Sequence, residues 1–164
     1  MKVFCSRFLL LTVSLFVFSV AVQAQKPAAP QKDLKLAGSW KLNLEKSKYA
    51  ATTAPKNPVI HTWWWDGDAL KHKVERLDDK GGVAGVGGQW TATFDAKDHL
   101  SGGEDKSRVS LKRIDAYHTE MTEGVPGEPQ SHFQQEVSKD GKTLTITRKV
   151  DGKDGQDVML HDRQ

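Results

Sequence analysis

The residues best suited to chemistry in this 164-residue chain are histidines that alternate with tryptophans in one short segment. His61 and Trp63 are two positions apart, and His72 follows beyond the Asp-Gly signal at 66–68. Imidazoles bind metal ions, exchange protons or orient polar ligands, whereas indoles offer large amphipathic contact surfaces. The sequence HTWWWDGD at 61–68 therefore indicates either a binding site or a strand with an unusually aromatic core.

Metal binding by His61 and His72 is one possibility, because two strands joined by a hairpin would bring them close together. The sequence has no H-E-x-x-H motif, no cluster of Cys and His, and no third ligand at a recognisable spacing. We therefore predict no metal site and no cofactor, and keep the histidine pair as a secondary hypothesis.

Acidic and hydroxyl side chains give no better candidate for chemistry. Asp151, Asp154 and Asp157 recur at every third position, but Lys153 and Gly155 stand where a calcium loop needs oxygen donors. We interpret these acids as solvated turn residues. No serine lies in a G-x-S-x-G context, and no carboxylate pair stands out among 21 acidic residues. The sequence predicts no catalytic residues and no enzyme activity.

Short alternating segments separated by Gly, Asp and Pro must position these side chains, and almost no helical periodicity is present. The expected strands are at about 38–43, 59–65, 69–77, 88–95, 107–114, 117–123, 131–138, 143–150 and 156–161. Asp-Gly pairs in the connections favour tight hairpins. This pattern predicts an all-β antiparallel meander that closes into a barrel or half-barrel of about eight or nine strands; the alternative is a two-layer β-sandwich.

Two connections stand out by length or composition. The glycine cluster at 81–88 predicts a flexible loop, and the segment at 46–57 predicts a long connection with a helical turn or a lid over an open barrel end. Neither resembles a phosphate-binding loop, since no helix follows the glycines.

Strand alternation divides the tryptophan segment between two faces. His61, Trp63 and Trp65 share one face, and Trp64 lies on the other. Pairing the aliphatic-bearing faces across the turn places His61, Trp63 and His72 toward the interior. Trp64 is then expected on the outside.

The functional interpretation of the inward set is a ligand pocket. Its predicted walls are aromatic, with two histidines as polar groups that orient the ligand; the residues are His61, Trp63, His72, Trp90, Phe94 and Phe133. The alternative is that these aromatic side chains fill a small barrel solidly.

Three motifs resemble a family of small secreted bacterial proteins, mostly uncharacterised, that are described as lipocalin-like. They are G-x-W-x-L-N at 38–43 followed by K-S-K at 46–48, V-S-L-K-R-I-D at 109–115, and S-K-D-G-K-T-L-T at 138–145. The resemblance implies a β-barrel in which Trp40 closes one end. It also implies that a late-strand arginine, Arg148 first and Arg113 second, stacks on Trp40 as a structural cation–π partner.

The first residues resemble an export signal. Lys2 and Arg7 precede an apolar run at 8–22, and small residues at 22 and 24 suit cleavage after Ala24. The run is shorter than the roughly 20 residues that a membrane-spanning helix needs. We predict a signal peptide at 1–24, a flexible leader at 25–36 and one barrel domain at 37–164, located in the periplasm or outside the cell.

The charge balance argues against a nucleic-acid surface. The chain has 24 Lys and Arg residues against 21 Asp and Glu residues, and acids and bases are interleaved throughout. We predict an exported monomer that binds a small apolar or amphipathic molecule, without a stable membrane span. The alternative is an interaction module of the cell envelope that uses the exposed Trp64 and has no small ligand.

Overall fold

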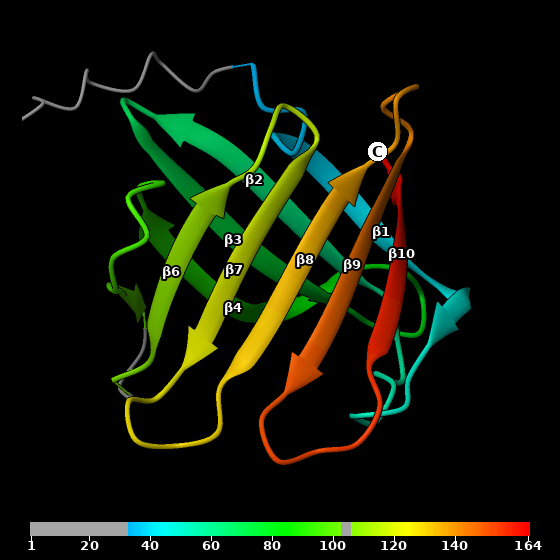
Figure 1. Cartoon of the computed structure of the whole chain (residues 1–164). Coiled ribbons are helices and arrows are strands. Elements are labelled where there is room, and N and C mark those ends of the chain that lie inside the picture. Colours follow the sequence, from blue (N-terminus) through cyan, green and yellow to red (C-terminus); the bar gives the residue numbers. More distant parts are fainter. Residues whose placement is uncertain (1–32, 103–105) are drawn as a thin grey trace, which may run out of the picture.

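The structure, a computed structural model, describes residues 33–102 and 106–164 and forms one antiparallel sheet (Figure 1). The strands are β1 (Gly38–Lys48), β2 (Val59–Asp66), β3 (Ala69–Leu77), β4 (Val83–Ala92), β5 (His99–Gly102), β6 (Arg108–Arg113), β7 (His118–Gly124), β8 (Ser131–Val137), β9 (Thr143–Val150) and β10 (Asp157–Arg163). The predicted signal peptide at 1–24 and the leader up to residue 32 lie outside the described residues.

The sheet is a closed barrel. Each strand pairs with its neighbours in the chain, and β1 pairs with β10 from Trp40↔Arg163 to Lys48↔Val158. The prediction of an all-β antiparallel barrel is thus confirmed. The half-barrel and the sandwich are wrong, because the first and last strands satisfy each other's edge hydrogen bonds. The barrel has ten strands, slightly more than expected.

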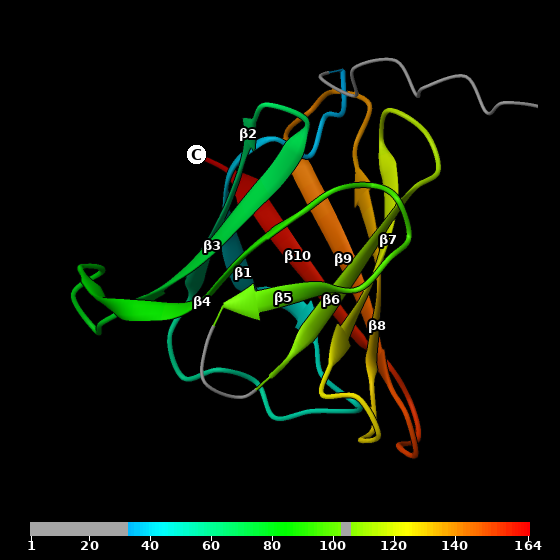
Figure 2. The same cartoon turned by 90° about the vertical axis from the view of Figure 1, so that its left-hand side faces the viewer.

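The additional strand is β5, which is four residues long. It pairs through two residues with β4 and two with β6, so the wall has its weakest pairing here (Figure 2). A segment this short carries too little alternation to be recognised in the sequence.

Hairpin turns explain the meander topology. Gly67 and Gly141 have φ angles of 61° and 71°, the left-handed conformation that the Asp-Gly turns require. Consecutive strands therefore pair directly, as the sequence predicts.

The two connections differ from expectation. The segment at 81–88 is mostly strand, since β4 begins at Val83 and pairs with β3 through irregular register at Val74/Glu75. The segment at 46–57 is strand up to Lys48 and then irregular, and it contains no helical turn. Glycines are compatible with a strand where bulges bend it, which is why the cluster is not a loop.

Asp157 organises the connection between β1 and β2. Its side chain is fully buried, and Oδ1 accepts hydrogen bonds from the backbone nitrogens of Ala50, Ala51 and Thr52 at 2.9, 2.8 and 3.1 Å. The Thr52 hydroxyl donates to Oδ2. Burial alone would raise the pKa of Asp157, but these hydrogen bonds lower it. The interpretation of Asp157 as a solvated turn acid is therefore wrong.

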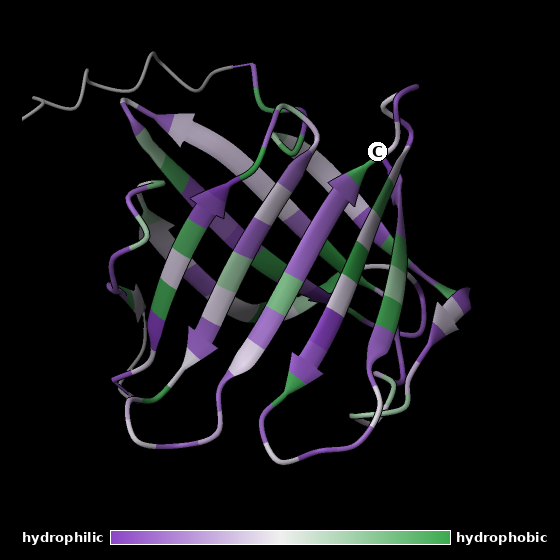
Figure 3. Cartoon of the chain, viewed as in Figure 1, coloured by the Kyte–Doolittle hydropathy of each residue, from purple (hydrophilic) through white to green (hydrophobic). Residues whose placement is uncertain are grey.

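One end of the barrel is solidly packed. Buried side chains from six strands meet there, namely Trp40, Leu70, Ala92, Leu111, Val137 and Leu144. Leu34 and Leu36 add to this cluster, so packing begins before residue 37 and includes the last residues assigned to the leader. Hydrophobic and hydrophilic residues alternate along the strands that surround it (Figure 3), as expected for strands with one buried face.

Trp40 is fully buried, and its Nε1 donates to the Leu36 carbonyl at 2.8 Å. The arginine stacked on it is Arg163, with its guanidinium carbon 4.1 Å from the ring centroid. The assignment of Arg148, or Arg113, to this role is wrong. Arg163 lies directly opposite Trp40 in the β1–β10 pair, whereas Arg148 is on β9 and packs over Phe133 at 5.5 Å.

Candidate functional site

A cavity of about 280 Å³ occupies the other half of the barrel, beyond the packed end. Its lining comes from β2, β3, β4 and β7–β10, so strands far apart in the sequence converge on it. Such a concave, largely apolar site with a few polar groups is typical of small-molecule binding.

The floor of the cavity consists of buried side chains that rest on the packed end. These floor residues are Trp63, His72, Trp90, Met121, Gln135 and Ile146. Most of them lie two positions along their strand from a fully buried residue, for example Ile146 from Leu144 and Gln135 from Val137. The floor contains no ionised side chain.

The rim consists of half-buried residues, one further step along the strands. The rim residues are His61, Val74, Glu123, Phe133, Arg148 and Met159. Two of them, Glu123 and Arg148, are charged. The charged side chains of the cavity therefore lie at its opening, and the side chains further inside are uncharged.

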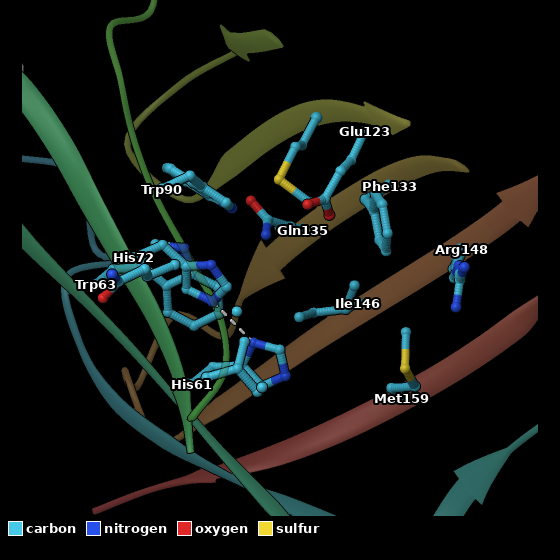
Figure 4. Close-up of a pocket in the computed structure, with 15 residues that line it drawn as sticks. His61, Trp63, His72, Trp90, Glu123, Phe133, Gln135, Ile146, Arg148 and Met159 are labelled. Atoms are coloured by element: carbon cyan, nitrogen blue, oxygen red, sulfur yellow. Dashed lines mark hydrogen bonds between the residues drawn. The ribbon is translucent and has the colours of Figure 1, made fainter. Parts of the chain in front are cut away.

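Stacked rings form one wall. The ring centroids of Trp63 and His72 lie 4.6 Å apart at an interplanar angle of 19°, and those of His72 and Trp90 lie 4.8 Å apart at 44°. His61 stacks on Trp63 at 5.3 Å. The rings of Trp63 and His72 overlap in this wall, and His61 lies beside them (Figure 4).

The two histidines are hydrogen-bonded to each other. His61 Nδ1 lies 3.0 Å from His72 Nε2. Burial lowers the pKa of His72 to about 3. Burial, and secondly the neighbouring His72 and His161, hold the pKa of His61 well below its usual range. Both imidazoles are therefore neutral near pH 7.

His161 approaches this pair from β10 and is completely buried. Its ring meets that of His61 edge-on at 5.1 Å, and neither of its nitrogens makes a well-formed hydrogen bond. Burial lowers the pKa of His161 to about 4, against a smaller opposing effect of the backbone carbonyls of Leu144 and Met159. The sequence analysis did not include His161 among the site residues.

Polar atoms of the floor are incompletely paired. Trp63 Nε1, Trp90 Nε1 and His72 Nδ1 are buried and have no hydrogen-bond partner among residues 33–102 and 106–164. Buried polar groups in native proteins are nearly always paired, so this concentration is unusual for a structural core. It favours a functional role for the cluster.

Arg148 is the cation at the rim. Its Nη2 donates to Ser131 Oγ at 2.9 Å, and it forms no ion pair within residues 33–102 and 106–164. Glu123, across the opening, accepts a hydrogen bond from Ser101 Oγ at 3.2 Å.

Five of the six predicted ligand residues line this one cavity: His61, Trp63, His72, Trp90 and Phe133. Phe94 does not. It lies in the irregular segment after β4, where it packs beside Trp65 with ring centroids 6.1 Å apart. That the five bind a ligand stays a prediction.

The structure adds lining residues that the sequence did not single out, notably Met121, Gln135, Ile146 and Met159. Alternation along their strands predicts that they point inward, as Val137 and Leu144 do. Gln135 was hidden because a single glutamine on an alternating strand is indistinguishable from a surface residue.

Metal binding finds no support in the geometry. Within the described part of the chain, no group of three or more His, Cys, Asp or Glu side chains could hold a metal ion. His61 and His72 direct one nitrogen each toward the other, which uses the atoms that would coordinate an ion.

Trp64 lies on the outer surface with 40% of its area exposed, as predicted. It borders a shallow surface groove with Lys71, Thr91 and Leu100, and Leu100 is 66% exposed. The outer groove shares His72, Gln89 and Trp90 with the lining of the interior cavity, whereas Trp64, Lys71, Thr91 and Leu100 line the groove alone. Residues 33–102 and 106–164 include no helix that is long and apolar enough to span a membrane.

Comparison with known proteins supports the antiparallel β-barrel fold. No protein-family model matches the sequence, and no curated protein does. A fatty acid binding protein of Schistosoma mansoni in complex with arachidonic acid has a TM-score of 0.60 at 16% identity, over 79% of this chain and 96% of that one. A secretory abundant heat soluble protein of Ramazzottius varieornatus has a TM-score of 0.62 at 13% identity, over 80% and 96%.

The fluorescent protein UnaG is also similar, with a TM-score of 0.57 at 15% identity over 79% of this chain and 98% of that one. At such identities the likeness shows the fold alone. It agrees with the lipocalin-like barrel that the sequence motifs predict.

Proposed function

We propose that this protein binds a small, partly apolar molecule in the interior cavity. The observation that carries the proposal is the cavity itself, which combines a largely apolar lining with a few polar side chains such as Gln135, His61 and Arg148. That similar barrels bind fatty acids, as the name of the Schistosoma protein states, supports the same use of the interior.

The cavity volume limits the ligand. A water molecule's share of liquid volume is about 30 Å³, so the space holds about ten non-hydrogen atoms. A long-chain fatty acid exceeds this size and would extend through the rim. The expected ligand is a compact molecule whose apolar part lies on the floor.

Native mass spectrometry of the protein purified from the cells that produce it tests this proposal. The expected result is a co-purifying small molecule that is lost in Met159→Trp, where a larger side chain enters the cavity from the rim. Trp64→Ala, on the outer face, is the matched control and should retain the same mass. Retention of the mass by Met159→Trp would show that the molecule lies elsewhere.

A second candidate function is contact with another envelope component through the outer groove. The exposed Trp64 and Leu100 favour it, because exposed tryptophan is enriched where proteins meet partners. The same two variants separate the candidates. A partner lost in Trp64→Ala and kept in Met159→Trp would favour the interaction module.

Export is part of the proposal and rests on the signal-like residues at 1–24. The intact mass of the protein recovered outside the cytoplasm should correspond to a chain that begins at Gln25. A full-length mass in that fraction would contradict cleavage after Ala24.

A further inference from the structure

The floor of the cavity presents hydrogen-bond donors and no ionised group, which restricts the chemistry of the ligand. Gln135 is the first donor. Only 3% of this residue is exposed, its Oε1 accepts from the Thr119 hydroxyl at 2.7 Å, and its Nε2 makes no hydrogen bond within the described part of the chain. Figure 4 shows its amide beside the space that His61, Ile146 and Phe133 surround.

The orientation of the Gln135 amide follows from Thr119. The Thr119 hydroxyl is buried, and its only hydrogen bond in the described chain is to Gln135. If the amide were reversed, the buried hydroxyl hydrogen of Thr119 would lose its acceptor, which is unfavourable. The arrangement with Oε1 on Thr119 is therefore preferred, and both Nε2 hydrogens remain with the cavity.

His61 is the second donor. Which of its ring nitrogens carries the hydrogen depends on the tautomer of His72, because the two rings share a hydrogen bond. One of the two nitrogens in the 3.0 Å contact must carry the hydrogen. His72 Nδ1 is buried without a partner, and an orphaned N–H is less tolerated than an orphaned lone pair. We therefore assign the hydrogen of His72 to Nε2, which donates to His61 Nδ1. The hydrogen of His61 is then on Nε2, for which the described part of the chain supplies no acceptor.

We propose that the inner part of the cavity, between the floor residue Gln135 and the adjoining rim residue His61, is a binding site for an uncharged oxygen acceptor, a ketone, ester or amide carbonyl, held by Gln135 Nε2 and His61 Nε2. A carboxylate would lie there without a cation, which is unfavourable in a buried site. Arg148, the cation of the cavity, is at the rim. A neutral carbonyl compound thus binds with its oxygen inward, and a carboxylate binds with its charge outward beside Arg148. This inference rests on the proposed function.

Three probes of nearly equal size test the inference: butylbenzene, its ketone analogue benzylacetone, and the carboxylate hydrocinnamate. Their affinities are measured by calorimetry at pH 7.5 for the wild type, Gln135→Met and Arg148→Gln. We expect Gln135→Met to weaken benzylacetone relative to butylbenzene roughly three- to tenfold, the effect of one hydrogen bond. Hydrocinnamate should weaken in Arg148→Gln and be unaffected by Gln135→Met.

The outcomes separate the inference from the proposed function. If butylbenzene binds but the ketone-to-hydrocarbon ratio is the same in Gln135→Met and wild type, the inference is overturned and the proposed function stands. If hydrocinnamate depends on Gln135 rather than Arg148, the assignment of charge to the rim is overturned. If none of the probes binds, the proposed function fails as well.

A measurement on the wild type alone covers the case in which Gln135→Met does not fold. The infrared carbonyl stretch of bound benzylacetone should lie at lower frequency than that of the ketone in hydrocarbon solvent, because two N–H groups polarise it. An unshifted stretch would overturn the inference. His61→Phe, which removes one of the two donors, should return the stretch part of the way.

Discussion

His61 Nδ1 lies 3.0 Å from His72 Nε2, and the two imidazole rings are nearly parallel, at an interplanar angle of 15°. The contact joins β2 to β3 inside the barrel, where Trp63 pairs directly with His72. Two neutral imidazoles thus satisfy part of each other's hydrogen-bonding capacity in an apolar wall. The remaining nitrogens give a cavity that is polar but uncharged.

The buried histidines predict acid destabilisation. His72 and His161 have pKa values of about 3 and about 4 in the fold, below 6.5 for the unfolded chain. The unfolded state therefore takes up protons first as pH falls through 6.5. Each histidine should lower the free energy of unfolding by about 1.4 kcal/mol per pH unit, until the folded protein titrates near pH 4 for His161 and pH 3 for His72.

This dependence is measured by urea denaturation of the wild type and of His161→Leu, at several pH values from about 7 down to about 4.5. The free energy of unfolding of the variant should fall less steeply with decreasing pH, because the variant takes up about one proton fewer on unfolding. Parallel curves for the two proteins would show that His161 is already protonated in the fold or stays neutral when unfolded.

The carboxylate of Asp157 is predicted to hold the connection between β1 and β2. Asp157→Asn replaces one acceptor oxygen by a donor that faces the Thr52 hydroxyl, so the free energy of unfolding should fall by about 2 kcal/mol. Asp154→Asn, at an exposed position in the preceding turn, is the matched control and should have little effect. Equal stability of the two variants in chemical denaturation would contradict this role.

Arg163, rather than Arg148, is predicted to stabilise the packed end. Its guanidinium stacks on Trp40 and donates to the carbonyls of Gly141 and Lys35 at 2.6 and 2.9 Å. Arg163→Ala should lower the free energy of unfolding by about 1–2 kcal/mol. Arg148→Ala should cost less, since Arg148 makes one hydrogen-bonded contact, to Ser131. A larger loss for Arg148→Ala in the same denaturation series would refute this ranking.

The sequence predicted the barrel because alternation and Asp-Gly turns are local signals. Nine of the ten strands were located, and His61, Trp63 and Trp64 were given the correct faces. Trp65, at the end of that segment's three tryptophans, shares the inward face with Trp63 and packs against the core.

Features that depend on barrel closure were not predictable in the same way. Arg163 faces Trp40 only because the last strand returns to the first, and Arg148 is a plausible candidate until that register is known. Asp157 is buried by a connection more than a hundred positions away in the sequence. Phe94 leaves the cavity because β4 ends at Ala92, three positions before the predicted end of that strand at 95.

Methyl chemical shifts during titration with butylbenzene test the central claim, a ligand-binding cavity, most directly. The methyl groups of Met121, Ile146 and Met159 line the cavity, whereas those of Ile114 and Leu100 are exposed on the outer surface. We predict saturable shifts of the three cavity methyls, with nuclear Overhauser contacts to the probe ring, and unchanged Ile114 and Leu100. Unchanged cavity methyls, or shifts confined to Leu100, would contradict the account.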